Sequence, residues 1–228
     1  MKNIIAKGGI EFLAVLIGIT SSLWIDDYST SLNDKKQGKD ALVNISVSLN
    51  KDLKQIDNVI RDLNNEITML DSMIYNFNSL SKDSVASYMD KINTYFTFYP
   101  NLSTYETLKN TGQLYKISDL DILEKIVNIY EMIYKSTEGW SLDDRRNILL
   151  LEDHLIEHYD VVPSDIWIIK FRDLDKEYDK LKNDQKLFNY LSALYGTKKG
   201  ALENINWAKK RNLKVLTEIN LSKKNMDN

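Results

Sequence analysis

The sequence predicts an all-α protein in which an N-terminal transmembrane helix leads into a long amphipathic helix and a helical bundle. Three observations support this prediction. The 228 residues contain only 8 Gly and 2 Pro, too few turn formers for an all-β fold. Residues 8–25 form an almost unbroken apolar run. Downstream segments repeat Leu and Ile at spacings of three and four, which is typical of one face of a helix.

The composition excludes several classes of function. With 30 basic and 33 acidic residues the formal net charge is −3, which points to no nucleic acid or other polyanionic partner. The chain has no cysteine, so disulfide bonds and thiolate metal sites are excluded. The sequence contains no glycine-rich phosphate loop and no Ser/His/Asp arrangement in a recognisable context. We therefore expect no cofactor and no enzymatic activity.

Changes in hydropathy divide the chain into five segments. We expect a cytoplasmic stub at 1–7, a transmembrane anchor at 8–28, a connector and long heptad helix at 29–82, a helical bundle at 83–221 and a disordered tail at 222–228. A helix over the apolar run is roughly 27 Å long, just enough for the hydrocarbon core of a bilayer. Lysines precede the run and two aspartates follow it, so the positive-inside rule places the N-terminus in the cytoplasm.

A cleaved signal peptide is the alternative interpretation of the same segment. The basic start fits one, and Thr20 with Ser22 resembles a cleavage site. However, Glu11 interrupts the apolar run, and the run continues through Ile25, beyond that site. We therefore favour a retained anchor with membrane lipid as its surroundings.

One face of the predicted transmembrane helix carries small residues. Ala14, Gly18 and Ser22 recur every four residues, a spacing that lets a second helix approach closely. Glu11 lies near the same face. This acid is either buried in a self-associating assembly, or it lies near the cytoplasmic boundary and reaches back toward Lys7. Both interpretations are compatible with self-association or with packing against another membrane protein.

The strongest periodicity lies between residues 40 and 78. Eight apolar residues continue it over four heptads: Leu53, Ile56, Ile60, Leu63, Ile67, Leu70, Ile74 and Phe77. The flanking e and g positions carry no code of opposite charges, and Val59 and Met73 widen the apolar stripe. We therefore predict one long helix packed against later helices of the same chain, with an intermolecular coiled coil as the alternative. No proline separates this helix from the anchor, so we expect the two to be nearly continuous, with any break at 29–33.

Shorter helices follow this one. We predict them at 83–98, from a Ser103–Glu106 capping box to Gly112, from Ser118 to about Thr137, at 141–159, at 175–195 and at 201–221. Residues 166–171 (IWIIKF) fit either a short strand or a buried helical turn.

Two motifs resemble an uncharacterised family of single-pass membrane proteins common in Bacteroidetes. The first is similar to the family's N-terminal helix at Glu11, Val15, Gly18, Ile19, Leu23 and Ile25, and departs from it at Ser22, Asp26, Asp27 and Tyr28. The second is similar to Y-x-x-L-x-x-x-G-x-L-x-x-I at Tyr105, Leu108, Gly112, Leu114 and Ile117. An aromatic-rich helix then ends with Tyr130 and Tyr134. The resemblance covers roughly residues 8–135 and implies an anchored helical domain. Together with the charges that flank the apolar run, it leads us to expect a protein of the bacterial inner membrane with the bulk of the chain in the periplasm. It implies no activity.

The only two histidines form a pattern that a zinc peptidase would use. His154, Glu157 and His158 match H-x-x-E-H, in which the histidines share a metal and the glutamate is a general base. Peptidases with this motif are much larger and need a third, distant carboxylate ligand. We favour a bundle helix with an apolar face, with the histidines at its margin, and that face is Ile148, Leu151, Leu155 and Tyr159. We predict no metal site.

These observations favour a non-catalytic single-pass membrane protein whose extracytoplasmic helical domain scaffolds or binds envelope partners as an oligomer. One alternative is a sensor, or a transmitter coupled to force or ions, that uses Glu11 within the membrane. A second alternative is a zinc hydrolase that uses the His154 and His158 pair.

Overall fold

The computed structural model describes the backbone of residues 2–163 and 169–226, and the side chains of residues 17–22, 24–163 and 169–222. Its elements are α1 (Lys2–Tyr75), α2 (Lys82–Ile92), α3 (Leu102–Asn110), α4 (Leu120–Asn128), α5 (Tyr134–His158), β1 (Val161–Pro163), β2 (Ile169–Phe171), α6 (Leu174–Lys182) and α7 (Gln185–Met226). Single turns of 3₁₀ helix lie at Phe77–Ser79 and Gln113–Lys116, and a π-helical turn lies at Ile129–Ile133. The described part is thus a helical bundle, as predicted.

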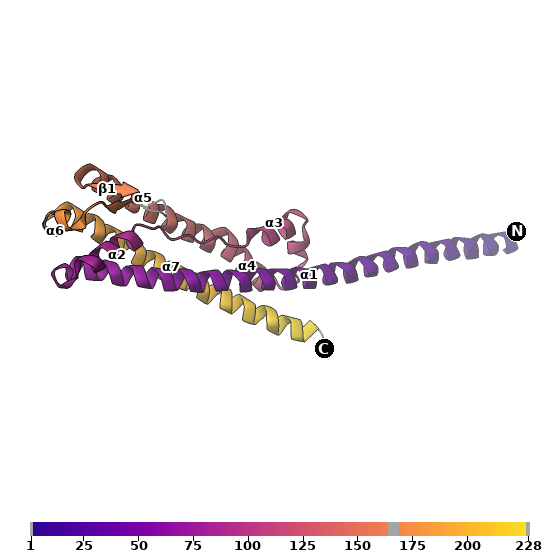
Figure 1. Ribbon diagram of the computed structural model, residues 1–228. Coiled ribbons are helices and arrows are strands. Elements are labelled where there is room, and N and C mark those ends of the chain that lie inside the picture. The colour runs from indigo at the N-terminus through magenta and orange to yellow at the C-terminus, as the bar shows by residue number, and fades with distance from the viewer. Residues whose placement is uncertain (1, 164–168, 227–228) are drawn as a thin grey trace.

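Helix α1 is continuous over 74 residues, about 110 Å of helix. The apolar run and the heptad helix are therefore continuous, as expected, and no break occurs at 29–33. The first half of α1 extends beyond the rest of the molecule, and all side chains described between residues 17 and 33 are exposed (Figure 1). Packing starts at Gly38, where a Cβ atom would overlap the carbonyl oxygen of Lys116.

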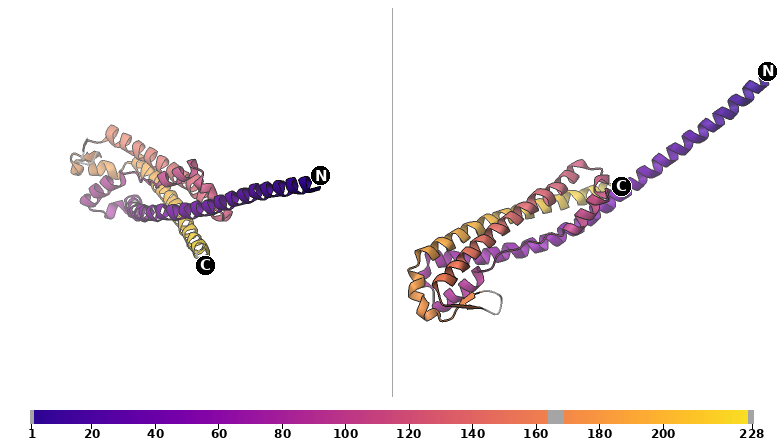
Figure 2. Two further views of the ribbon diagram at one scale, coloured as in Figure 1. Left: turned by 90° about the vertical axis from the view of Figure 1, so that its right-hand side faces the viewer. Right: turned by 90° about the horizontal axis from the view of Figure 1, so that it is seen from above.

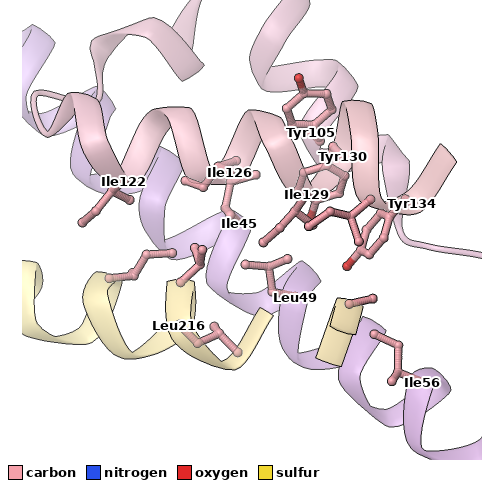
Figure 3. Packing of buried hydrophobic residues seen from close by; sticks show 14 of the residues in the cluster. Ile45, Leu49, Ile56, Tyr105, Ile122, Ile126, Ile129, Tyr130, Tyr134 and Leu216 are labelled. Atoms are coloured by element: carbon pink, nitrogen blue, oxygen red, sulfur yellow. The ribbon is translucent and has the colours of Figure 1, made fainter. Parts of the chain in front are cut away.

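The second half of α1 packs beside α7, and α7 also packs against α5. These three long helices run alongside one another, and the shorter elements cover their ends (Figure 2). The core consists of two clusters along this layer. Near the middle of α1, Ile45 and Leu49 meet Ile126, while Leu216 of α7 covers them from the other side (Figure 3).

The heptad stripe of α1 does not point straight at this core, because its d positions are more buried than its a positions. Its d-position residues are buried, namely Ile56, Leu63, Leu70 and Phe77. Its a-position residues Leu53, Ile60, Ile67 and Ile74 are only partly buried. The g positions are buried more deeply than predicted and include Asp52, with no exposed surface, as well as Val59 and Met73. The helix therefore turns its d and g edge inward, as a helix packed within its own chain does, rather than the a and d seam of a symmetric coiled coil.

Two predicted helix boundaries were wrong. The helices predicted to end near Thr137 and to begin at 141 form one run, because α5 continues through these residues and follows the π-helical turn directly. The helices predicted at 175–195 and 201–221 break instead at Asn183 and Asp184, and α7 continues through Gly196 and Gly200. Gly200 allows close packing, since a Cβ atom there would overlap the indole ring of Trp140.

The shorter helices begin differently from the sequence prediction. Helix α3 starts after Asn101 instead of at a Ser103–Glu106 capping box, and Ser103 Oγ bonds Asn101 Oδ1 at 3.1 Å. Helix α4 is capped by Asp119, whose carboxylate accepts the N–H of Ile122. Gly112 follows α3 with a φ of 75°, which confirms the predicted helix end.

A small hairpin interrupts the helical pattern. Strand β1 pairs with β2 in antiparallel register, with Val162 opposite Lys170. The segment IWIIKF therefore ends as a strand over Ile169–Phe171, the first of the two alternatives. Residues 164–168 lie outside the described part of the chain.

Candidate functional site

A segment without regular structure at 95–101 crosses the surface of the bundle between α2 and α3 (Figure 1). The prediction of a helix to residue 98 was wrong, because α2 ends at Ile92. Aromatic and β-branched residues dominate this stretch, and such residues favour an extended backbone. What decides its path is a set of buried charged side chains from the three long helices.

Lys198 of α7 and Asp144 of α5 hold the first part of this segment. The ammonium of Lys198 lies 3.0 Å from Asp144 Oδ2 and donates a 3.1 Å hydrogen bond to the carbonyl of Thr94. Asp144 Oδ2 also accepts the backbone N–H of Phe96 at 3.0 Å. Burial raises the pKa of Asp144, while Lys198 and the Phe96 N–H oppose that rise.

Two further groups complete the attachment. Ser141 Oγ donates to the carbonyl of Phe96 at 2.8 Å. At the other end, Asp52 of α1 accepts the N–H of Asn101 at 2.7 Å and the hydroxyl of Tyr134 at 2.9 Å. Burial raises the pKa of Asp52 despite these hydrogen bonds. The extended segment is therefore fixed to α1, α5 and α7 at once.

An aromatic cavity of about 590 Å³ lies between this segment, α3 and the start of α5. Six rings line it: Tyr95, Phe98, Tyr99, Tyr105, Tyr130 and Tyr134. Tyr105 stacks on Tyr130 with ring centroids 4.4 Å apart, and Phe98 meets Tyr134 edge to face at 5.1 Å. Figure 3 shows Tyr105 and Tyr130 side by side above the core. Tyr105, Tyr130 and Tyr134 are almost fully buried, whereas Tyr95 and Tyr99 are exposed at the edge of the cavity.

Charged side chains surround these rings in equal numbers. The acids are Glu106, Glu131 and Glu138, and the bases are Lys109, Lys135 and Arg145, so the formal charges of the lining cancel. Glu131 binds Lys109 at 2.6 Å, Lys135 at 2.9 Å and the hydroxyl of Tyr105 at 3.0 Å. These hydrogen bonds, first from Lys109, lower the pKa of Glu131 to about 2. Arg145 lies over the ring of Tyr95, 5.6 Å from its centroid.

The π-helical turn at Ile129–Ile133 helps to build this cavity. Such a turn contains one residue more than an α-helical turn, and π-turns inside helices are frequent at functional sites. Here Tyr130 and Glu131 lie within the turn and Tyr134 directly follows it, and all three line the cavity. The arrangement suits binding of a molecule or segment with an apolar or aromatic body and polar ends.

Sequence reasoning missed the side chains that hold this site together. Asp52 and Glu66 occupy g positions of the long helix, each seven residues from Val59. An acid at a heptad position that is otherwise apolar could have been recognised from the sequence as a candidate buried charge. Lys198 and Asp144 offered no comparable signal. Tyr95, Tyr99 and Arg145 were missed because the segment at 95–101 was expected to be partly helical.

The two histidines lie at the other end of the bundle from the aromatic cavity. His154 is buried, and its Nε2 lies 2.6 Å from Asp184 Oδ2, which also accepts the hydroxyl of Tyr159 at 2.6 Å. His158 is exposed and its ring packs edge to face on that of His154. Within the described side chains, no group of three or more His, Asp or Glu residues could hold a metal ion. His154 is thus bound to a carboxylate of its own chain.

Burial alone would raise the pKa of Asp184, but three hydrogen bonds reverse the effect. The Tyr159 hydroxyl, the Leu187 N–H and His154 together lower that pKa to about 2. The same carboxylate therefore caps the start of α7 and ties it to α5.

The predicted transmembrane residues are described only in part. The side chains of Glu11 and Ala14 lie outside the described residues, whereas Gly18 and Ser22 are exposed on the protruding part of α1. Among the described residues, no helix combines the length and the apolar character that crossing a membrane requires.

Comparison with known protein families, with curated proteins and with solved structures gave no match to this chain. The resemblance to the Bacteroidetes membrane-protein family stays a prediction.

Proposed function

We propose that this chain is a non-catalytic, single-pass membrane protein of the bacterial inner membrane, and that its periplasmic bundle binds partners as an oligomer. The observation that carries this proposal is the protruding half of α1, whose apolar side chains at residues 17, 19, 24 and 25 are covered by no other described part of the chain. Trp24 is 71% exposed, and Ile17, Ile19 and Ile25 are each more than half exposed.

The distribution of these side chains supports a lipid environment. Ile17 and Ile19 are about 200° apart around the helix axis, so apolar groups occupy opposite sides of the helix. A helix that packs on one partner needs only one apolar face, whereas a helix in lipid needs all of them. Trp24 stacks on Tyr28 at 6.0 Å just where aspartates begin, as aromatic residues do at a membrane interface.

The aromatic cavity supports the binding function of the bundle. Tyr99 is 73% exposed at its edge, and Arg145 is exposed beside Tyr95. Exposed aromatic rings with a nearby guanidinium are the residue types that dominate binding energy at protein interfaces.

Membrane attachment is tested by alkaline carbonate extraction of native membranes. We expect the wild-type chain to stay in the membrane pellet. Ile17→Lys places a charge in the apolar run, at a cost of about 3 kcal/mol for insertion, and should move a substantial fraction to the supernatant. Val47→Lys changes an exposed residue of α1 beside the bundle and is the matched control. Extraction of the wild-type chain would overturn the membrane assignment.

Partner binding is tested by a photocrosslinking amino acid introduced at Tyr99 in cells. We expect a discrete adduct from position 99 and none from Tyr75, which is equally exposed but lies at the far end of α1. The same pattern of adducts at both positions, or none at either, would contradict a binding role for the cavity.

A further inference from the structure

The segment at 94–99 uses its backbone hydrogen bonds on one edge only. The three groups that bind the bundle are the carbonyl of Thr94 and both the N–H and the carbonyl of Phe96. In an extended chain, the N–H and C=O of one residue point to the same edge, and those of its neighbours point to the other edge. The backbone groups of Tyr95, Thr97 and Tyr99 therefore belong to the opposite edge.

This second edge is unpaired. No hydrogen bond within the described part of the chain engages the backbone of Tyr95, Thr97 or Tyr99. A hollow of about 940 Å³ lies along Tyr95, Phe96 and Thr97, on the side of α1 and α2, so there is room beside the segment. An extended, uncharged edge of this kind is a template for strand pairing.

The sequence of the segment is self-complementary. Residues 95–99 read Tyr-Phe-Thr-Phe-Tyr in both directions. Two copies placed antiparallel about a two-fold axis at Thr97 match position 95 with position 99 of the second copy for any sequence. Here the palindrome makes each matched pair identical, Tyr with Tyr and Phe with Phe. All five residues are good strand formers, and pairs of aromatic residues or threonines are favourable across strands.

We propose that two copies of this chain associate through this edge, with Thr97 opposite Thr97 of the second copy. The pairing joins the free backbone groups of Tyr95, Thr97 and Tyr99 in both copies and covers the exposed Tyr95 and Tyr99 rings. This pairing gives a specific structure to the oligomer of the proposed function. It rests on the proposed oligomerisation and does not depend on the proposed membrane anchor.

The absence of native cysteine makes this geometry directly testable. Thr97→Cys is introduced into the full-length chain, which is oxidised in its own membranes. Opposed residues in such a pair have Cα atoms about 5.5 Å apart, within the range that a disulfide bridges. We expect a covalent dimer to form at least tenfold faster than for Tyr75→Cys, which is exposed far from this edge.

The register provides matched controls. Tyr95→Cys alone places the two thiols roughly 14 Å apart and should not crosslink, whereas Tyr95→Cys combined with Tyr99→Cys should crosslink as readily as Thr97→Cys. Crosslinking of Tyr95→Cys alone, or no crosslinking of Thr97→Cys, would overturn the proposed pairing. A crosslink from Thr97→Cys to a different protein would overturn it as well and would assign the edge to that partner.

A second measurement does not depend on cysteine. Thr97→Pro removes one N–H from the free edge, and Thr97→Val keeps it. Sedimentation in detergent should show a dimer for the wild type and for Thr97→Val, and a monomer for Thr97→Pro with unchanged helical circular dichroism. A dimer that survives Thr97→Pro would refute this interface while leaving oligomerisation intact. A monomeric wild type would refute both, and carbonate extraction would still test the membrane anchor separately.

Discussion

Lys198 Nζ lies 3.0 Å from Asp144 Oδ2, and neither side chain has any exposed surface. This pair joins α7 to α5, and Glu66 of α1 approaches the same ammonium at 2.7 Å. One buried cation therefore connects the three long helices and, through Thr94 and Phe96, also holds the extended segment. Burial raises the pKa of both Glu66 and Asp144, and Lys198 opposes that rise in each. For Glu66, the nearby Asp144 carboxylate raises the pKa further.

Lys198→Met should destabilise the bundle strongly. Removing one partner leaves two buried carboxylates without a cation, and breaking such a pair costs about 3–5 kcal/mol. Urea unfolding of the full chain in detergent, followed by circular dichroism, measures this loss. Lys199→Met, at an exposed neighbouring position, is the control and should change stability by no more than about 0.5 kcal/mol. Equal effects of the two substitutions would contradict a structural role for the buried cation.

Asp184 should make the bundle sensitive to acid. Its folded-state pKa of about 2 lies below the ordinary value of 3.8, so the folded chain holds this proton less tightly than the unfolded chain. The resulting stabilisation, about 2 kcal/mol, is present above pH 4 and is lost as the pH falls from about 4 to 2. The stability difference between wild type and Asp184→Asn should shrink over that range in urea titrations at each pH. A difference in unfolding free energy that stays constant with pH would show that the Asp184 carboxylate does not titrate in this way. The control is Asp153→Asn, at an exposed position of α5.

Two glycines in the middle of α7 should respond oppositely to alanine. A Cβ atom at Gly200 would overlap the ring of Trp140, whereas no atom lies within 4 Å of a Cβ atom at Gly196. Gly200→Ala should therefore lower the unfolding free energy by about 1–3 kcal/mol, and Gly196→Ala should raise it by up to about 1 kcal/mol through helix propensity. Thermal unfolding of both variants measures these changes, and stabilisation by Gly200→Ala would contradict the close contact.

Gly38 should be required where α1 first meets the bundle. Its missing side chain lets the backbone of α1 approach the Lys116 carbonyl, and backbone cannot move aside as a flexible side chain can. Gly38→Ala should destabilise by about 1–3 kcal/mol and increase amide exchange in the turn at Gln113–Lys116. Gly139→Ala in α5, where no atom lies within 4 Å, is the matched control and should be neutral or stabilising. Unchanged exchange in Gly38→Ala would place the start of packing elsewhere.

The helical character of this chain follows from local information. Periodicity at three and four residues identified the burial of Ile56, Leu63 and Leu70 without knowledge of their partners. Gly112 likewise ended its helix with a positive φ, because a residue without a Cβ atom has no steric penalty there.

Features that depend on contacts between distant residues could not be predicted from the sequence in this way. Helices predicted at 175–195 and 201–221 left a gap at 196–200, yet α7 continues through Gly196 and Gly200, where packing on Trp140 outweighs helix propensity. The candidate site depends even more on such contacts, since the aromatic cavity forms only where α3, α5 and the segment at 95–101 pack together.

The sequence by itself determined the helix content, the apolar face of the long helix and the exposed apolar run near the N-terminus, since each depends on residues close together in the chain. Only the tertiary structure decided that the d and g edge of α1 turns inward, that residues 95–101 have no regular structure and that Lys198 reaches Asp144 and Glu66. The physical reason is that a buried charge is tolerable only where its counter-charge is supplied, and here that counter-charge comes from helices 54 and more residues away.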